Sequence, residues 1–178
     1  MEDLPFGIVV RALDPERMGV TVPPLMESLR LAGVPPGATS VICEPLASAA
    51  RHADLPRWVV YLHDAMAVGG GFVRKAFDLY RLLSEAPASA RVGCARLTDA
   101  VSVGLYDTAW LKTLEPTTPD DAIPGGKACG DHESARVLKG GFQYAEDEAP
   151  LSIEWYPSLD VYRFVGADGG GDGGGADP

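Results

Sequence analysis

Cysteine is scarce in this sequence, and its spacing excludes the common cysteine-based sites. The 178 residues contain three cysteines, Cys43, Cys94 and Cys129, and no CxxC pair. A zinc ribbon and a thioredoxin-type redox motif both need such a pair, so neither is expected. The simplest interpretation is three reduced thiols in a cytoplasmic protein.

Long apolar runs and an excess of basic residues are also missing. No run approaches the roughly 20 apolar residues of a transmembrane helix, and the first residues lack the basic start and apolar centre of a signal peptide. Only 15 Lys and Arg accompany 25 Asp and Glu, which gives a net charge of −10. Nucleic acids and anionic membranes attract clustered Lys and Arg, so neither is an expected partner.

Several motifs that mark nucleotide-binding proteins and hydrolases are absent. Outside the Gly- and Asp-rich residues 166–178 the chain has no G-x-G-x-x-G, and it has no P-loop and no G-x-S-x-G. The three glycines at 69–71 are followed by Phe72 and Val73 instead of the Lys and Ser of a P-loop. A zinc site is not expected either, because no ligand spacing links the histidines and cysteines that could form one: His52, His63, His132, Cys43 and Cys129.

The strongest positive signal is the unbroken apolar and aromatic run from Trp58 to Leu62. It stops at His63 and Asp64 and is followed by the glycines at 69–71. A short apolar run bounded by turn residues is typical of a strand buried on both faces in a mainly parallel sheet. Open α/β sheets bind ligands at the carboxyl ends of such strands, which makes this end the first candidate site.

The rest of the chain alternates between strand and helix patterns. We expect strands over 6–13, 40–43, 57–62, 92–97, 142–145, 151–155 and 160–165, and helices from Pro23 to about Gly33 and over 46–54, 71–85, 107–114 and 133–138, with 115–130 as a long loop. This order predicts one α/β domain over residues 1–165, with a mainly parallel sheet, helices on both faces and a late antiparallel portion. The Gly- and Asp-rich residues 166–178 cannot form a core and are expected to be a disordered tail.

His63 and Asp64 could hold a divalent metal ion through nitrogen and oxygen. The metal would then neutralise the diphosphate of a substrate. The alternative is structural: Asp64 would cap the turn, and His63 would bond a backbone carbonyl. The sequence leaves both open.

Asp131 and Glu133 form a second candidate site at the expected start of the 133–138 helix. The positive end of a helix stabilises a carboxylate as an anion, and an ionised carboxylate can act as a general base. The alternative is ordinary N-capping by Asp131.

Basic residues near strand ends form a third set, and each could bind a phosphate or a carboxylate. The alternative for each is a solvated or salt-bridged surface position. The set contains Arg11, Arg17 and Arg96.

Together these segments resemble the GT-A type of nucleotide-sugar glycosyltransferases. The resemblance covers about residues 6–145 and is carried by the Arg11 strand and by the segments 24–33, 58–66, 71–76 and 130–142. It implies a GT-A-like, Rossmann-like fold and a sugar transferred from a nucleotide-sugar donor to an unknown hydroxyl acceptor.

The resemblance also implies roles for individual residues. Asp64, with His63, would hold a manganese or magnesium ion, as the family's D-x-D signature does. Arg11 and Glu44 would contact the nucleotide together with Asp64. The family's acidic helix start corresponds to Asp131 or Glu133, which would be the catalytic base.

Two other functions stay open. Ala65 stands where the family has a second metal-binding carboxylate, so the chain could be a catalytically inactive GT-A-like binding or assembly protein. It could also be an unrelated α/β enzyme that acts on a small phosphorylated or carboxylated substrate at the same strand ends.

Overall fold

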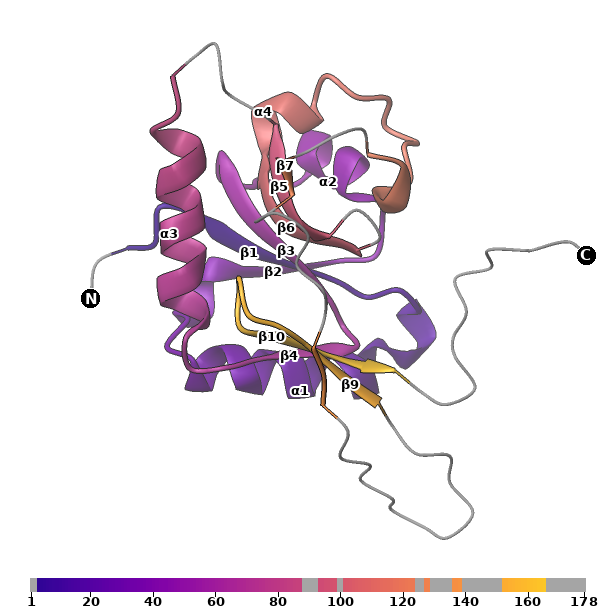
Figure 1. The fold of residues 1–178 in the computed structure, drawn as a ribbon. Coiled ribbons are helices and arrows are strands. Elements are labelled where there is room, and N and C mark those ends of the chain that lie inside the picture. Colours follow the sequence, from indigo (N-terminus) through magenta and orange to yellow (C-terminus); the bar gives the residue numbers. More distant parts are fainter. Residues whose placement is uncertain are drawn as a thin grey trace, which may run out of the picture.

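A computed structural model describes residues 3–87, 93–98, 101–123, 127–128, 136–138 and 152–165. The fold is α/β, with two sheets and helices packed on them (Figure 1). The strands are β1 (Gly7–Arg11), β2 (Thr39–Ile42), β3 (Trp58–His63), β4 (Met66–Val68), β5 (Cys94–Thr98), β6 (Val101–Asp107), β7 (Lys127–Ala128), β8 (Arg136–Leu138), β9 (Ser152–Tyr156) and β10 (Val161–Val165). The helices are α1 (Met18–Leu31), α2 (Leu46–His52), α3 (Phe72–Ser84) and α4 (Thr108–Leu111), with short 3-10 turns η1 (Pro15–Arg17), η2 (Pro36–Ala38) and η4 (Asp120–Ala122).

The large sheet has the order β2-β1-β3-β6-β5-β7 and is mixed. β1 pairs in parallel with β2 and β3, whereas β6 runs antiparallel to both β3 and β5. The prediction of a mainly parallel sheet was therefore wrong. The reason is the short connection between β5 and β6: two residues separate Thr98 from Val101, and a parallel pairing would need a crossover of about a dozen residues.

The small sheet has the order β4-β10-β9-β8 and is antiparallel throughout. It confirms the late antiparallel portion, in which β9 and β10 form a hairpin. The sequence patterns did not identify β4. The helix predicted over 133–138 is wrong for residues 136–138, which pair as β8 with β9. A six-residue helix has little stability of its own, so pairing with an open strand edge prevails.

Helix α1 begins five residues earlier than predicted, at Met18 instead of Pro23. Pro23 and Pro24 therefore lie inside the helix and remove two backbone donors. The carbonyls that lose their partners belong to Gly19 and Val20, which are exposed and can bond water. The predicted end is confirmed: Gly33 adopts a φ of +90°, and the bonds that follow the helix form a Schellman motif.

Helices α2 and α3 and strands β1, β2, β3 and β5 lie where the sequence predicted them, within a few residues. Residues 101–107 form strand β6, and the helix predicted over 107–114 is shortened to α4. The predicted strand at 142–145 and the predicted tail at 166–178 lie outside the described residues. None of the described helices combines the length and the apolar character that crossing a membrane requires.

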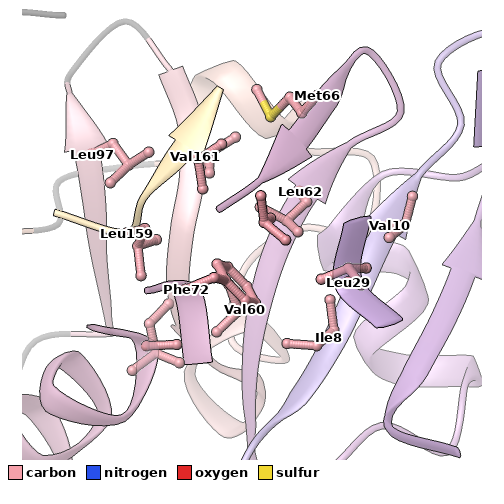
Figure 2. Packing of buried hydrophobic residues seen from close by; sticks show 14 of the residues in the cluster. Ile8, Val10, Leu29, Val60, Leu62, Met66, Phe72, Leu97, Leu159 and Val161 are labelled. Carbon is pink, nitrogen blue, oxygen red and sulfur yellow. The ribbon is translucent and has the colours of Figure 1, made fainter. Parts of the chain in front are cut away.

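Two apolar cores lie on opposite faces of the large sheet, so helices cover both faces as predicted. The first core lies between the sheet, α1, α3 and the β9–β10 hairpin. Figure 2 shows its central residues, which come from five strands, two helices and the hairpin turn: Ile8, Val10, Leu29, Val60, Leu62, Met66, Phe72, Leu97, Leu159 and Val161. The second core lies under α2 and α4 and includes Val9, Val59, Tyr61, Cys94 and Tyr106.

Asp160 attaches the hairpin to the start of α3. Its carboxylate accepts hydrogen bonds of 2.9 Å from the Gly71 amide and from the Trp155 indole. A Cβ atom on Gly69 would lie 2.2 Å from Oδ2 of Asp160, whereas one on Gly70 would meet nothing within 4 Å. Gly69 therefore lies at a close contact between this turn and the hairpin.

Candidate functional site

The carboxyl ends of β1 and β3 meet at one edge of the large sheet. Arg11 lies opposite His63 in the parallel register, and the amide of Asp64 donates to the carbonyl of Arg11 at 3.0 Å. Three of the predicted site residues are thus brought together. This is the edge at which open α/β sheets bind ligands.

Asp64 lies on the α1 side of this edge. Its side chain is buried, and the Thr21 hydroxyl from the first turns of α1 donates to Oδ2 at 2.7 Å. Within the described part of the chain, Oδ1 has no hydrogen-bond partner. One oxygen is therefore fixed by the helix, and the other can accept a bond from a ligand or coordinate a cation.

His63 points to the other side of the sheet, because adjacent residues of a strand alternate in direction. Its Nε2 lies 3.0 Å from the Ser102 hydroxyl on β6, and its ring meets the edge of Tyr61 at 5.3 Å between centroids. Burial lowers the pKa of His63 below its usual value, and the nearby Arg163 and Arg11 act in the same direction. Asp120 and Asp64 oppose this shift. The ring is therefore neutral near pH 7.

Asp120 is a buried carboxylate that the sequence patterns did not single out. It belongs to η4, in the segment predicted as a loop, and it accepts bonds from three donors: the Arg11 guanidinium at 2.5 Å, the Leu46 amide at 2.7 Å and the Tyr61 hydroxyl. Burial and the Asp120 carboxylate together raise the pKa of Tyr61. The phenol therefore stays protonated and donates a hydrogen bond to Asp120. The pair of acids after Pro119 was the only sequence signal, and loop residues often carry such roles.

The remaining predicted residues are less closely grouped. Glu44 follows β2 and accepts a bond from the Ser48 hydroxyl. No hydrogen bond within residues 3–87 joins it to Arg11 or Asp64. Arg17 is exposed in η1, while Arg96 is buried on β5. Asp131 and Glu133, the predicted catalytic bases, lie outside the described residues.

The expected metal ligands turn away from each other. Asp64 is directed to α1 and His63 to β6, and each already has a protein partner. Among the described residues, no group of three His, Cys, Asp or Glu side chains is arranged to hold a metal ion. A divalent metal at Asp64 would therefore need its other ligands from the substrate, from water or from residues beyond the described part.

Comparison with models of known protein families found no match, and comparisons with curated proteins and with solved structures found none either. The functional argument therefore depends on the geometry of the strand ends.

Proposed function

We propose that the protein is glycosyltransferase-like and binds a nucleotide-sugar donor at the carboxyl ends of β1 and β3, for transfer of the sugar to a hydroxyl acceptor. Asp64 would bind the donor diphosphate, through a manganese or magnesium ion. Arg11 and Glu44 would lie beside the nucleotide. Asp131 or Glu133 would remove the proton of the acceptor hydroxyl.

One observation carries this proposal: Arg11, His63 and Asp64 converge at one sheet edge although Arg11 and His63 are 52 positions apart in sequence. Asp64 is also pre-organised, because Thr21 fixes one carboxylate oxygen and leaves the other without a described partner. A carboxylate held in this way loses little entropy when a ligand binds.

A thermal-shift experiment tests the proposal. A panel of nucleotide sugars with manganese at millimolar concentration should raise the melting temperature, because a ligand that binds the folded state stabilises it by mass action. Asp64→Asn should abolish the shift and leave the fold intact. Asp78→Asn is the matched control, since Asp78 is exposed on α3, and it should keep the shift. No shift with any nucleotide sugar would remove the proposal.

A second candidate function is a non-catalytic binding or assembly protein of the same fold. It is favoured by the partners that His63 and Asp64 already have and by the absence of a three-ligand metal group from the described residues. An unchanged melting temperature in the panel, together with a stable protein partner, would select it.

A further inference from the structure

Strand β2 forms one edge of the large sheet, and its outer side has no partner in the described part of the chain. Among the described strands, β2 pairs only with β1. The Ala12 amide donates to the carbonyl of Ile42 at 2.9 Å, so the backbone groups of Ile42 face β1. Because these groups point to alternate sides along a strand, those of Thr39 and Val41 point outward. The edge therefore presents donors and acceptors to which a further strand can bond.

This edge lacks the features with which proteins protect edge strands. Charged side chains, prolines and bulges in an edge strand discourage pairing with another chain. Residues 31–43 contain no charged side chain, and β2 itself contains no proline. The register of β2 with β1 runs without a bulge. Val41 is 41% exposed within this edge. The edge is therefore open to strand pairing.

An apolar groove of about 330 Å³ lies beside β2 on the α1 face of the sheet. Pro23 and Met26 line it from α1, and Thr39 lines it from β2. The charged residues among its lining are Glu27 and Arg30, which form a bidentate ion pair with two N–O distances of 2.7 Å. The groove therefore offers an apolar space without net charge to side chains on this face of an added strand.

A second pocket, of about 430 Å³, lies at the amino ends of β1 and β2. Ser40 lines it from β2. Because adjacent residues of a strand point to opposite faces, Ser40 and Thr39 border the two pockets from opposite sides of the sheet. Among the described residues that line this second pocket, the charged ones are Asp3 and Asp54, and both are exposed. The pocket is therefore acidic and has no basic residue in its described lining.

We propose that the β2 edge binds an extended peptide segment of a partner protein as an added strand, in which apolar and basic residues alternate. The segment bonds to the outward backbone groups of Thr39 and Val41. Alternate side chains of a strand point to opposite faces of the sheet. The apolar ones enter the groove beside Met26, and the basic ones lie toward Asp3 and Asp54. In strand addition, main-chain hydrogen bonds give affinity and side-chain pockets give specificity.

Charge favours a basic segment over a second copy of this chain. The net charge is −10. A second copy that paired through its own β2 would bring the same net charge, and another Asp3 and Asp54, to this edge. A basic segment is instead attracted to these carboxylates. The inference is independent of the proposed function, because both pockets adjoin the amino end of β2, whereas Asp64 lies at the carboxyl ends of the strands.

Fluorescence anisotropy with a labelled peptide of alternating lysine and valine, blocked at both ends, tests the site on the whole chain. Wild type should bind this peptide saturably. A peptide of the same composition, with its lysines and valines in two blocks, should bind roughly fivefold more weakly or less, because it cannot place them on opposite faces. Failure of wild type to bind the alternating peptide, or equal affinity for the block peptide, would overturn the site.

Val41→Pro removes the outward amide donor and keeps the bonds that Ser40 and Ile42 make to β1. Proline is tolerated on an edge strand where the amide faces outward, so the melting temperature should stay close to that of wild type. Peptide affinity should fall roughly tenfold, since a hydrogen bond is lost and the proline ring takes its place. Val41→Ile keeps the amide and should bind like wild type. Equal affinity in Val41→Pro and Val41→Ile would contradict strand addition.

If Val41→Pro does not fold, an N-methylated form of the alternating peptide decides on the wild-type chain. This peptide keeps its charge and side chains but has no backbone donors, so it should lose most of its affinity. Undiminished binding would show that charge alone holds the peptide and would overturn the site.

Two further measurements test the occupant. Replacing both acidic residues of the pocket, by Asp3→Asn with Asp54→Asn, should weaken peptide binding roughly threefold. Asp78→Asn, on the exposed side of α3, is the control and should bind like wild type. Equal affinity in the double variant and the control would exclude a basic occupant. Wild type without peptide should sediment as a monomer. A dimer that Val41→Pro dissociates would identify a second copy as the occupant and overturn the proposal.

Discussion

The two faces of the large sheet differ most at the carboxyl ends of its strands. On the α1 and α3 face, apolar side chains continue to the end of β1 and β3, and the β9–β10 hairpin covers them. On the α2 and α4 face, the apolar residues stop early, Arg11 and Tyr61 donate hydrogen bonds to Asp120, and the His63 ring contacts Tyr61. The same strands build both faces. The difference teaches that the α1 and α3 face stays apolar up to Asp64, whereas the other face carries a polar cluster at the same end of the strands.

The largest expected effect is on the polar face. Asp120→Ala should lower the free energy of unfolding by about 3 kcal/mol, because it leaves Arg11 with a partly buried, unpaired charge. This is the low end of the range for broken buried pairs, since 18% of the Arg11 side chain remains exposed. Urea unfolding measures the loss.

Asp121→Ala is the matched control, because Asp121 is its exposed neighbour in η4. It should change the free energy of unfolding by no more than about 0.5 kcal/mol. Equal effects of the two substitutions would mean that the cluster contributes nothing specific to the polar face.

The second effect concerns the β9–β10 hairpin, which covers the apolar α1 and α3 face of the sheet. Gly69→Ala should lower the free energy of unfolding by about 1 to 3 kcal/mol, because the new methyl group meets the Asp160 carboxylate that attaches the hairpin to α3. Gly70→Ala adds the same methyl group where nothing lies within 4 Å. Both losses in the free energy of unfolding are measured in urea. An equal or smaller loss for Gly69→Ala than for Gly70→Ala would show that the hairpin moves to accommodate the methyl group.

The smallest effect is a pH dependence from His63. Its pKa is lowered in the folded protein, chiefly by burial, so at high pH the ring is neutral in both states and contributes nothing to pH dependence. As pH falls through the ordinary histidine value of about 6.5, the unfolded chain binds the proton first and stability decreases. His63→Asn should therefore lose less stability than wild type between pH 7.5 and 5.5.

His52→Asn is the control for that experiment, because His52 is exposed on α2. It should keep the wild-type pH profile. The groups that act on His63 from other elements are Asp120 of η4, Arg163 of β10 and Arg11 of β1. Parallel profiles of wild type and His63→Asn would indicate that the ring titrates as it does in water.

Local patterns were sufficient to locate most elements. The run from Trp58 to Leu62 predicted a buried strand, and the helical spacing after Gly71 predicted α3, because periodicity and turn residues act over a few positions. Strand direction was less accessible. The antiparallel direction of β6 follows from its two-residue connection to β5. That connection can be interpreted only once β5 and β6 are both recognised as strands.

The candidate site was predictable only in part. Arg11, His63 and Asp64 were predicted because they follow apolar strands, and these three do meet at one edge. Asp120 was missed because its role comes from contacts 59 to 109 positions away in sequence. Whether Asp131 or Glu133 acts as a base stays a prediction, since both lie outside the described residues.

The sequence by itself determined the α/β class, the buried strand that ends at His63 and the polar residues that follow it, since each depends on local pattern. Only the tertiary structure decided which face each polar residue occupies and which partner it has. Alternation sends Asp64 to Thr21 of α1 and His63 to Ser102 of β6, although the two residues are adjacent in the chain. Burial and pairing of charge are properties of elements brought together from distant positions, and no local pattern encodes them.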